Sequence, residues 1–129
     1  KNLSMDHVLI VHGFDGLDEI TITDSTYVAE LKDNTISEYE ISPKDFGLSL
    51  GTLPEISASS PDDSLQLIRE AFSGDQSAVQ DMIALNAGAA LYLAKKVDSI
   101  ENGVELSFEL MNNGMAADKL ASYVRVSKS

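Results

Sequence analysis

The first third of the chain has the hydrophobic pattern of β-strands. Val8–Val11 is an unbroken aliphatic run, which is typical of a parallel strand buried on both faces. Glu19–Thr23 alternates polar and apolar residues and predicts a half-buried strand. Two further strands are predicted at Thr26–Leu31 and Ile36–Ile41, joined by a tight turn at Asp33–Asn34 because both turn residues tolerate the required backbone angles.

The second half has helical spacing. Ser60 and Pro61 form a start signal, since a hydroxyl caps a helix and proline suits its first position. A longer helix is predicted over Ser77–Lys96. It is apolar nearly all round and has small residues in its middle, so we expect it to be buried and closely packed. Two more helices are predicted at Glu101–Asn112 and Ala116–Val126, with their Met, Leu and Tyr side chains in the core.

These elements favour an α/β fold with a partial mixed sheet and flanking helices. A first strand that is apolar on both sides needs cover on both faces, and the central helix is too apolar for a surface position. The length of 129 residues suits one domain. We divide it into a strand-rich part (7–42), a connecting loop (43–59) and a helical part (60–128).

Composition narrows the possible partners. The formal net charge of −12 opposes binding to nucleic acid and to anionic membranes, and no basic cluster offsets it. The chain has no cysteine, which excludes disulfides and thiolate chemistry, and it has no apolar run of about 20 residues for a membrane span. We therefore expect a cytoplasmic protein without nucleic-acid or membrane partners. Because the chain begins with Lys1 and soon reaches a strand, we also expect a fragment.

The loop after the first strand carries the candidate chemistry. His12–Glu19 contains two glycines that permit a sharp turn and three carboxylates, Asp15, Asp18 and Glu19. We expect these acids to converge at the end of the strand, where ligands of α/β sheets gather. Acids without cysteine nearby suit magnesium, which takes one or two protein carboxylates and leaves other positions for substrate phosphates. The alternative is a solvated turn, which is the commoner role of such loops.

The same loop and several later segments resemble anthranilate phosphoribosyltransferases. Val11–Ile20 looks like the "VHG-x-DGLDE" signature of that family. Further segments match family motifs in the same order: Val28–Leu31 ("VxEL"), Pro43–Leu48 ("PxDFGL"), Ile68-Arg69 with Gly74 (the end of a helix), Asp81–Tyr92 ("D…LNAAAALY") and Glu101–Val104 ("EGV"). The similarity extends over nearly the whole chain.

This resemblance implies a phosphoribosyltransferase-like α/β domain and a specific reaction. The family transfers the 5-phosphoribosyl group from phosphoribosyl pyrophosphate to anthranilate, which gives N-(5′-phosphoribosyl)anthranilate and pyrophosphate in tryptophan biosynthesis. Family members are magnesium-dependent and usually homodimeric. Carried over to this sequence, Asp18 and Glu19 are the expected metal ligands, whereas Asp15 is expected to shape the turn. No residue of this chain is assigned as catalytic.

The departures from the family pattern are equally informative. The glycine-rich "GTGGD" phosphate loop, the "KHGN" segment and the small helical dimerisation domain are absent from this sequence. A polyphosphate needs backbone amides or cations to hold it. We therefore expect the chain alone to be inactive, and to self-associate through uncovered sheet edges and helix faces. The alternative function is a non-catalytic binding module of the same fold, including a nucleic-acid-binding paralogue.

Four further residues have ordinary interpretations. We expect His12 to hydrogen-bond to backbone at a strand end, and His7 to be exposed. Asn86 should lie in the buried helix and bond to a neighbouring loop, because a buried amide needs partners. Arg69 is expected to pair with an acid on its own helix.

Overall fold

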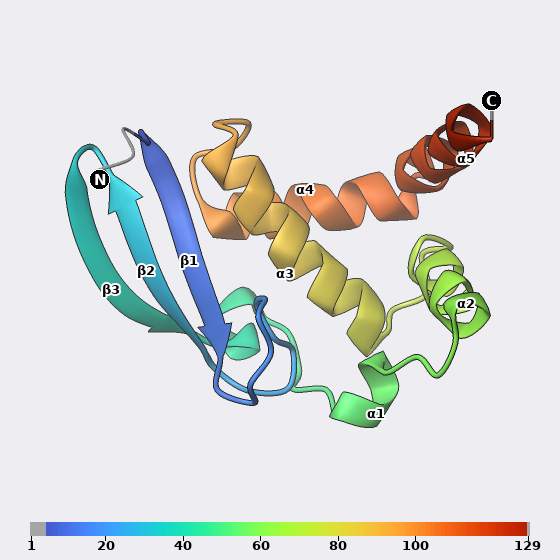
Figure 1. The fold of residues 1–129 in the computed structure, drawn as a ribbon, viewed down its shortest axis with the longest axis horizontal. Helices are drawn as coiled ribbons and strands as arrows, with labels where there is room; N and C mark the ends of the chain where they lie inside the picture. The colour runs from blue at the N-terminus through green and yellow to red at the C-terminus, as the bar shows by residue number, and fades with distance from the viewer. Residues whose placement is uncertain (1–4, 129) are drawn as a thin grey trace.

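The computed structural model describes residues 5–128 and begins with a three-stranded antiparallel sheet. Strands β1 (His7–Gly13), β2 (Thr26–Lys32) and β3 (Thr35–Ile41) follow one another in the order β1-β2-β3 (Figure 1). Asp33 and Asn34 turn the chain between β2 and β3 with φ values of 47° and 63°. These left-handed conformations are the ones a two-residue hairpin turn requires, and they confirm the predicted turn.

The α/β class and the flanking helices are confirmed, but the first strand is not buried on both faces. Ile10 is 67% exposed on the outer side of the sheet, whereas Leu9 and Val11 on the inner side pack against the core. All pairing among the described strands is antiparallel, so the mixed part of the expected sheet is not found within residues 5–128. An unbroken apolar run did not distinguish a doubly covered strand from one covered on a single face.

The predicted strand at Glu19–Thr23 is wrong. This segment is an irregular loop, in which Ile20, Thr21 and Ile22 are all at most 3% exposed. Its backbone hydrogen bonds do not go to the backbone of a neighbouring strand: Thr21 N–H donates to the side-chain Oγ1 of Thr26, and Ile22 O accepts from Gly51 N–H. The alternating sequence pattern therefore marks a buried loop and not a half-exposed strand.

The helices follow the sheet in sequence. The segment expected as a loop, 43–59, contains two short helices. The elements after β3 are η1 (Pro43–Phe46), α1 (Leu53–Ile56), α2 (Pro61–Ala71), α3 (Ala78–Leu93), α4 (Ile100–Asn112) and α5 (Met115–Ser127). The predicted start of α2 is confirmed, because the Ser60 side chain accepts a hydrogen bond from Asp63 N–H and Pro61 is the first helical residue.

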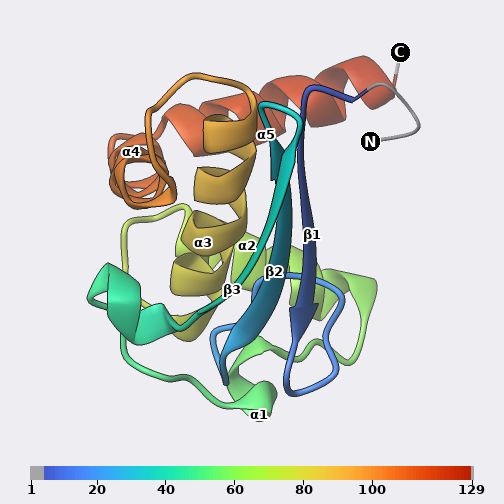
Figure 2. The same ribbon diagram turned by 90° about the vertical axis from the view of Figure 1, so that its left-hand side faces the viewer.

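Helix α3 lies against the inner face of the sheet, and α4 packs across α3 on the other side (Figures 1 and 2). Glycines permit the close approach of these two helices. A Cβ atom at Gly103 would lie 2.3 Å from Gly88 O, and one at Gly88 would lie 2.6 Å from Val104 N. The expected close packing of α3 through its small residues is thereby confirmed. The core lies around this contact and comprises Ile20, Ile22, Ala84, Leu85, Ala89, Ile100, Val104 and Met111.

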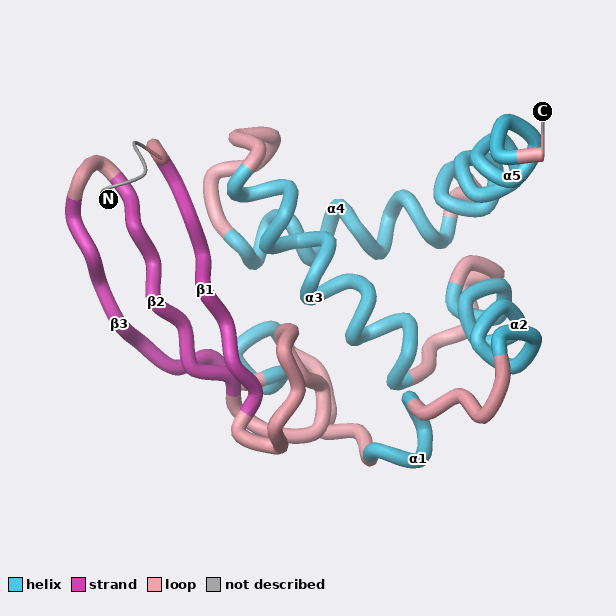
Figure 3. Tube along the Cα trace, in the orientation of Figure 1, coloured by secondary structure: helices cyan, strands magenta, loops and turns pink. Residues whose placement is uncertain are grey.

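The last helix does not contribute to the core as predicted. Helix α5 has no buried residue, and Tyr123 is 72% exposed. Figure 3 shows α5 at the end of α4, on the side of the molecule opposite the sheet. On α4, in contrast, Met111 is 3% exposed, so the expected core role holds for that helix only. No helix within residues 5–128 is both long and apolar enough to cross a membrane.

Candidate functional site

The candidate site is the loop that connects β1 to β2. Its first turn is closed by backbone hydrogen bonds from Gly13 N to Leu17 O and from Gly16 N to Gly13 O, both 2.9 Å. Gly16 has a φ of +95°, a conformation that favours glycine. A Cβ atom at Gly13 would lie 2.5 Å from Asp15 Oδ1. The two glycines predicted to allow a sharp turn therefore do so, one through its backbone angle and the other through lack of space.

Asp15 holds this turn together from inside. Its Oδ1 accepts a hydrogen bond from Leu17 N–H at 3.1 Å, and its Oδ2 accepts from the hydroxyls of Thr21 and Thr23. Partial burial raises the pKa of Asp15, but these hydrogen bonds outweigh it and hold the pKa below its usual value. The carboxylate thus shapes the loop, as expected.

Asp18 and Glu19 project from the same loop and are both exposed. The pKa of Glu19 is raised, first by partial burial and second by the negative charge of Asp18. The negative charge of Asp18 thus acts on Glu19, its neighbour in the sequence. The expected convergence of three acids is wrong, because Asp15 is engaged with the threonines. Within residues 5–128, no group of three His, Asp or Glu side chains is placed to hold a metal ion.

Asn86 on α3 anchors the loop directly after the acid pair. Its Oδ1 accepts from Ile20 N–H at 3.0 Å, and its Nδ2 donates to Ile20 O at 2.8 Å and to Met82 O at 3.0 Å. The amide therefore replaces the strand partner that Ile20 lacks. The predicted bond between Asn86 and a neighbouring loop is confirmed.

A surface pocket of about 460 Å³ lies beside the acid pair. Its wall is mostly apolar, and Glu19 and Asn86 are among its few polar residues. The pocket is lined by Leu17, Glu19, Leu53, Ile56, Ser57, Val79, Met82, Ile83, Asn86 and Ala87. The loop, α1 and α3 thus form one concave surface next to Glu19.

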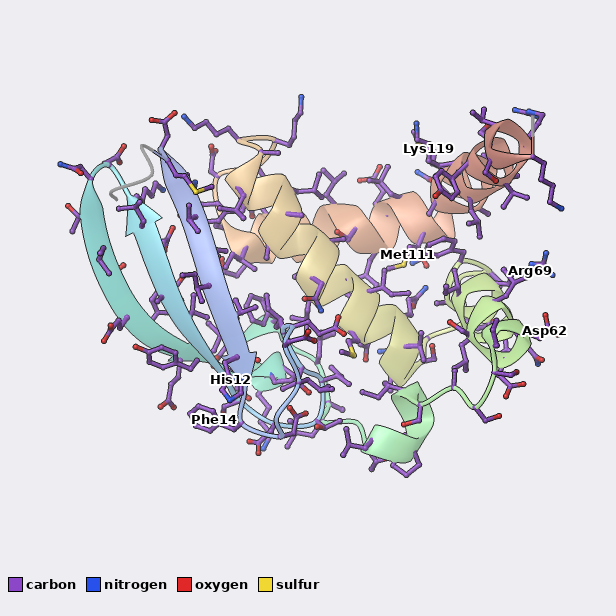
Figure 4. The ribbon with its side chains drawn as sticks, viewed as in Figure 1. His12, Phe14, Asp62, Arg69, Met111 and Lys119 are labelled. Atoms are coloured by element: carbon purple, nitrogen blue, oxygen red, sulfur yellow. The ribbon has the colours of Figure 1, made fainter. Side chains whose placement is uncertain are left out.

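Three other expectations are corrected. His12 lies at the end of β1 near Phe14 (Figure 4); its side chain is exposed and makes no hydrogen bond within the described residues. Arg69 points outward from α2 (Figure 4). It forms no ion pair with any residue in the range 5–128. His7 is not exposed: its side chain is 7% accessible and its Nε2 lies 2.8 Å from Glu30 Oε1.

The polar cluster around Glu30 was not predicted from the sequence. This residue is 8% exposed on the inner face of β2 and accepts hydrogen bonds from His7, Tyr39 and Tyr92. One signal was available, since strand alternation places Glu30 on the same face as Val28. Its partners come from β1, β3 and α3, and no local pattern indicates that they meet.

Comparison with known proteins gives the family. The family described as "Glycosyl transferase family, a/b domain" matches residues 1–117. The anthranilate phosphoribosyltransferase of Vesicomyosocius okutanii is 45% identical over 127 residues, covering 98% of this chain and 38% of that protein. The chain therefore spans little more than a third of the length of this relative.

Solved structures give the same result. The anthranilate phosphoribosyltransferase of Thermus thermophilus superimposes with a TM-score of 0.84 at 30% identity, covering 95% of this chain and 36% of that one. A Saccharomyces cerevisiae variant of the enzyme with Mg bound has a TM-score of 0.76 at 25% identity, covering 89% and 34%. The fold, the ordered motifs and these matches lead to one conclusion: the chain belongs to the glycosyl transferase family and forms part of its α/β domain.

Proposed function

We propose that this chain is part of an anthranilate phosphoribosyltransferase. The complete enzyme transfers the 5-phosphoribosyl group from phosphoribosyl pyrophosphate to anthranilate and releases pyrophosphate. Relatives that share 45% of their aligned residues with this chain bear that name, and they support the proposal. We further propose that the complete enzyme is a cytoplasmic homodimer that requires magnesium, and that the chain alone is inactive.

The observation that carries the proposal is the exposed acid pair Asp18–Glu19. Its donors are two carboxylates, which is the ligand type that magnesium prefers. The raised pKa of Glu19 reflects burial and repulsion by Asp18, and a cation held by these carboxylates would offset that repulsion. The residues present therefore fit a magnesium ion that is completed by water and substrate oxygens, and the yeast relative has Mg bound.

The chain's own part in the reaction is to hold these two carboxylates in place. When bound, the cation would neutralise charge on the departing pyrophosphate, an electrostatic effect on the transition state. Asp18 and Glu19 would set its position, while the hydrogen bonds of Asp15 and Asn86 restrict the loop on either side. Rigid placement matters because preorganised charges need not rearrange during the reaction.

Replacing both acids in the complete enzyme tests the proposal. With Asp18→Ala and Glu19→Ala together, we expect the rate of anthranilate consumption, followed by its fluorescence, to fall by about 100-fold. The magnesium concentration that gives half of the maximal rate should rise. The isolated chain, assayed in parallel, should show no turnover.

The matched control is a double alanine variant at Glu105 and Glu109, two exposed acids on α4. It removes the same charge from a surface away from the loop and should leave rate and magnesium dependence unchanged. An acid-pair variant with normal rate and normal magnesium requirement would refute the assignment of these two residues. Robust turnover by the isolated chain would refute its proposed inactivity.

A further inference from the structure

Asn86 is a partly buried amide that holds the loop beside the acid pair. It binds both backbone polar groups of Ile20, the residue that immediately follows Glu19. The third bond, from Nδ2 to Met82 O one helical turn earlier, fixes which end of the amide faces Ile20 N–H. These bonds favour one orientation of the side chain and tie the backbone beside the acid pair to α3.

The part of helix α3 that carries Asn86 is tightly packed. Leu85 is fully buried beside it, and Gly88 is in close contact with the backbone of α4 at Gly103 and Val104. A helix held this tightly has little freedom to shift relative to its neighbours. Movement of the loop away from α3 would leave the N–H and C=O of Ile20, which is 3% exposed, without partners, and that is costly in a protein interior.

The acid pair is fixed from its other side as well. Asp15 accepts from Leu17 N–H, so the residue before Asp18 is held to the first turn. Asp18 and Glu19 are therefore the two residues that lie between two side-chain anchors, one within the loop and one on α3. Their own side chains remain exposed, as ligands for a substrate-bound cation must be.

We infer that Asn86 is a positioning residue, which acts through Ile20 to hold Asp18 and Glu19 in the geometry that binds magnesium. The inference rests on the function proposed above. Side chains that orient metal ligands commonly change metal affinity or activity by about 10- to 100-fold when they are replaced. A purely structural amide would instead change stability without changing the magnesium dependence of the folded molecules.

The same helix supplies a matched control. Gln80 is 2% exposed, and its Nε2 donates to Ala71 O at 2.9 Å and to Asn112 Oδ1 at 3.1 Å. Like Asn86, it is an amide on α3 that donates to a backbone carbonyl, but its partners lie on α2 and α4. Substitution of Gln80 disturbs the helix in a comparable way without touching the loop.

The experiment compares Asn86→Leu with Gln80→Met in the complete enzyme. Both changes replace an amide by an apolar side chain of similar size and add no charge near the cation. The readouts are the thermal midpoint and the magnesium concentration that gives half of the maximal rate at saturating substrates. Asn86→Ala is the second variant at the site, because its smaller side chain leaves room for water beside Ile20 if the leucine variant does not fold.

We expect both substitutions to lower the thermal midpoint, but only the Asn86 variants to raise the half-saturating magnesium concentration, by about 10-fold. Unchanged magnesium dependence in the Asn86 variants, or an equal change in Gln80→Met, would overturn the inference. The acid-pair variant separates the two proposals. If it alters magnesium dependence and the Asn86 variants do not, only the positioning role is wrong; if it has no effect, the metal assignment and this inference both fail.

Discussion

Glu30 is a carboxylate in the interior, between the sheet and α3. Its Oε1 accepts hydrogen bonds from His7 Nε2 at 2.8 Å and from Tyr92 OH at 2.9 Å, and its Oε2 accepts from Tyr39 OH at 2.9 Å. Burial raises the pKa of Glu30, but these three donors together outweigh it and hold the pKa below its usual value. One ionised side chain thus connects β1, β2, β3 and α3.

The depressed pKa of Glu30 predicts sensitivity to acid. A carboxyl whose pKa is lower in the folded state stabilises the fold fully above its unfolded-state pKa of about 4.3, and this contribution is lost as pH falls through the folded value. Glu30→Gln should cost about 1–3 kcal/mol at pH 7, because the amide nitrogen cannot accept and at least one of the three donors loses its acceptor. Urea unfolding should show that the variant loses less stability than the parent between pH 7 and pH 3.

The control for this prediction is Glu40→Gln, on the neighbouring strand, where the side chain is exposed. It should leave both the stability at pH 7 and its decline in acid as they are in the parent. Parallel curves for the parent and Glu30→Gln over the whole pH range would show that the buried hydrogen bonds do not favour the ionised form.

For a single residue, the sequence predicts whether its side chain forms a hydrogen bond or is exposed only where the neighbouring residues indicate its surroundings. Asn86 stands in a mostly apolar helix, so a bond to a nearby loop was predictable, although its partner Ile20 was not. His7 was predicted to be exposed because it stands near the start of the chain. Its burial depends on Glu30 and on the Tyr92 ring, whose centroid is 4.8 Å away, and both are distant in sequence.

The contact between helices α3 and α4 leaves no room for an added methyl group at Gly103. Gly103→Ala should improve helix propensity by about 1 kcal/mol. However, the new Cβ would lie 2.3 Å from Gly88 O and 2.8 Å from Gly88 Cα, and backbone cannot move aside as a flexible side chain can. Overpacking of this kind costs about 1–3 kcal/mol, so we expect net destabilisation in urea unfolding.

Glu105→Ala, on the exposed side of the same helix, is the control for the glycine substitution. It gains helix propensity without a clash and should leave stability unchanged or slightly higher. A Gly103→Ala variant that is more stable than the parent would mean that α3 and α4 can separate without loss of packing.

Helix α2 was predicted from its own local signal, whereas the structure of Glu19–Thr23 depends on distant segments and was not predicted. Helix α2 begins at its cap as expected, because Ser60 bonds to a backbone amide three residues away. Glu19–Thr23 has the alternation of a strand but no strand beside it. Its backbone is satisfied by Asn86, Thr26 and Gly51, which come from three separate parts of the chain.

For the whole molecule, the order of strands and helices in the sequence was enough to predict the α/β class. It was not enough to predict which faces of the sheet and helices are exposed. Hydrophobicity predicted cover for both faces of β1 and a buried position for the side chains of α5. The structure instead leaves Ile10, Ile36 and Tyr123 at least 60% exposed. An apolar side chain indicates that burial is favourable, and it does not say which layer supplies the cover.

This exposure predicts that the isolated chain self-associates. β1 is an edge strand of the sheet in the described part of the chain (Figure 1), and it lacks lysine and proline, the residues that commonly protect such edges. Ile10 and Ile36 are exposed on the strands of this sheet. The net charge of −12 opposes contact between copies, so association should increase with salt as the repulsion is screened.

Multi-angle light scattering should therefore show a molar mass that rises with both protein and salt concentration. Ile10→Lys should lower that mass because it places a charge on the edge strand, whereas Gln66→Lys, with the same added charge on the exposed side of α2, should lower it less. A monomer at every concentration, or equal effects of the two lysines, would mean that net charge and not the edge of β1 controls how the copies meet.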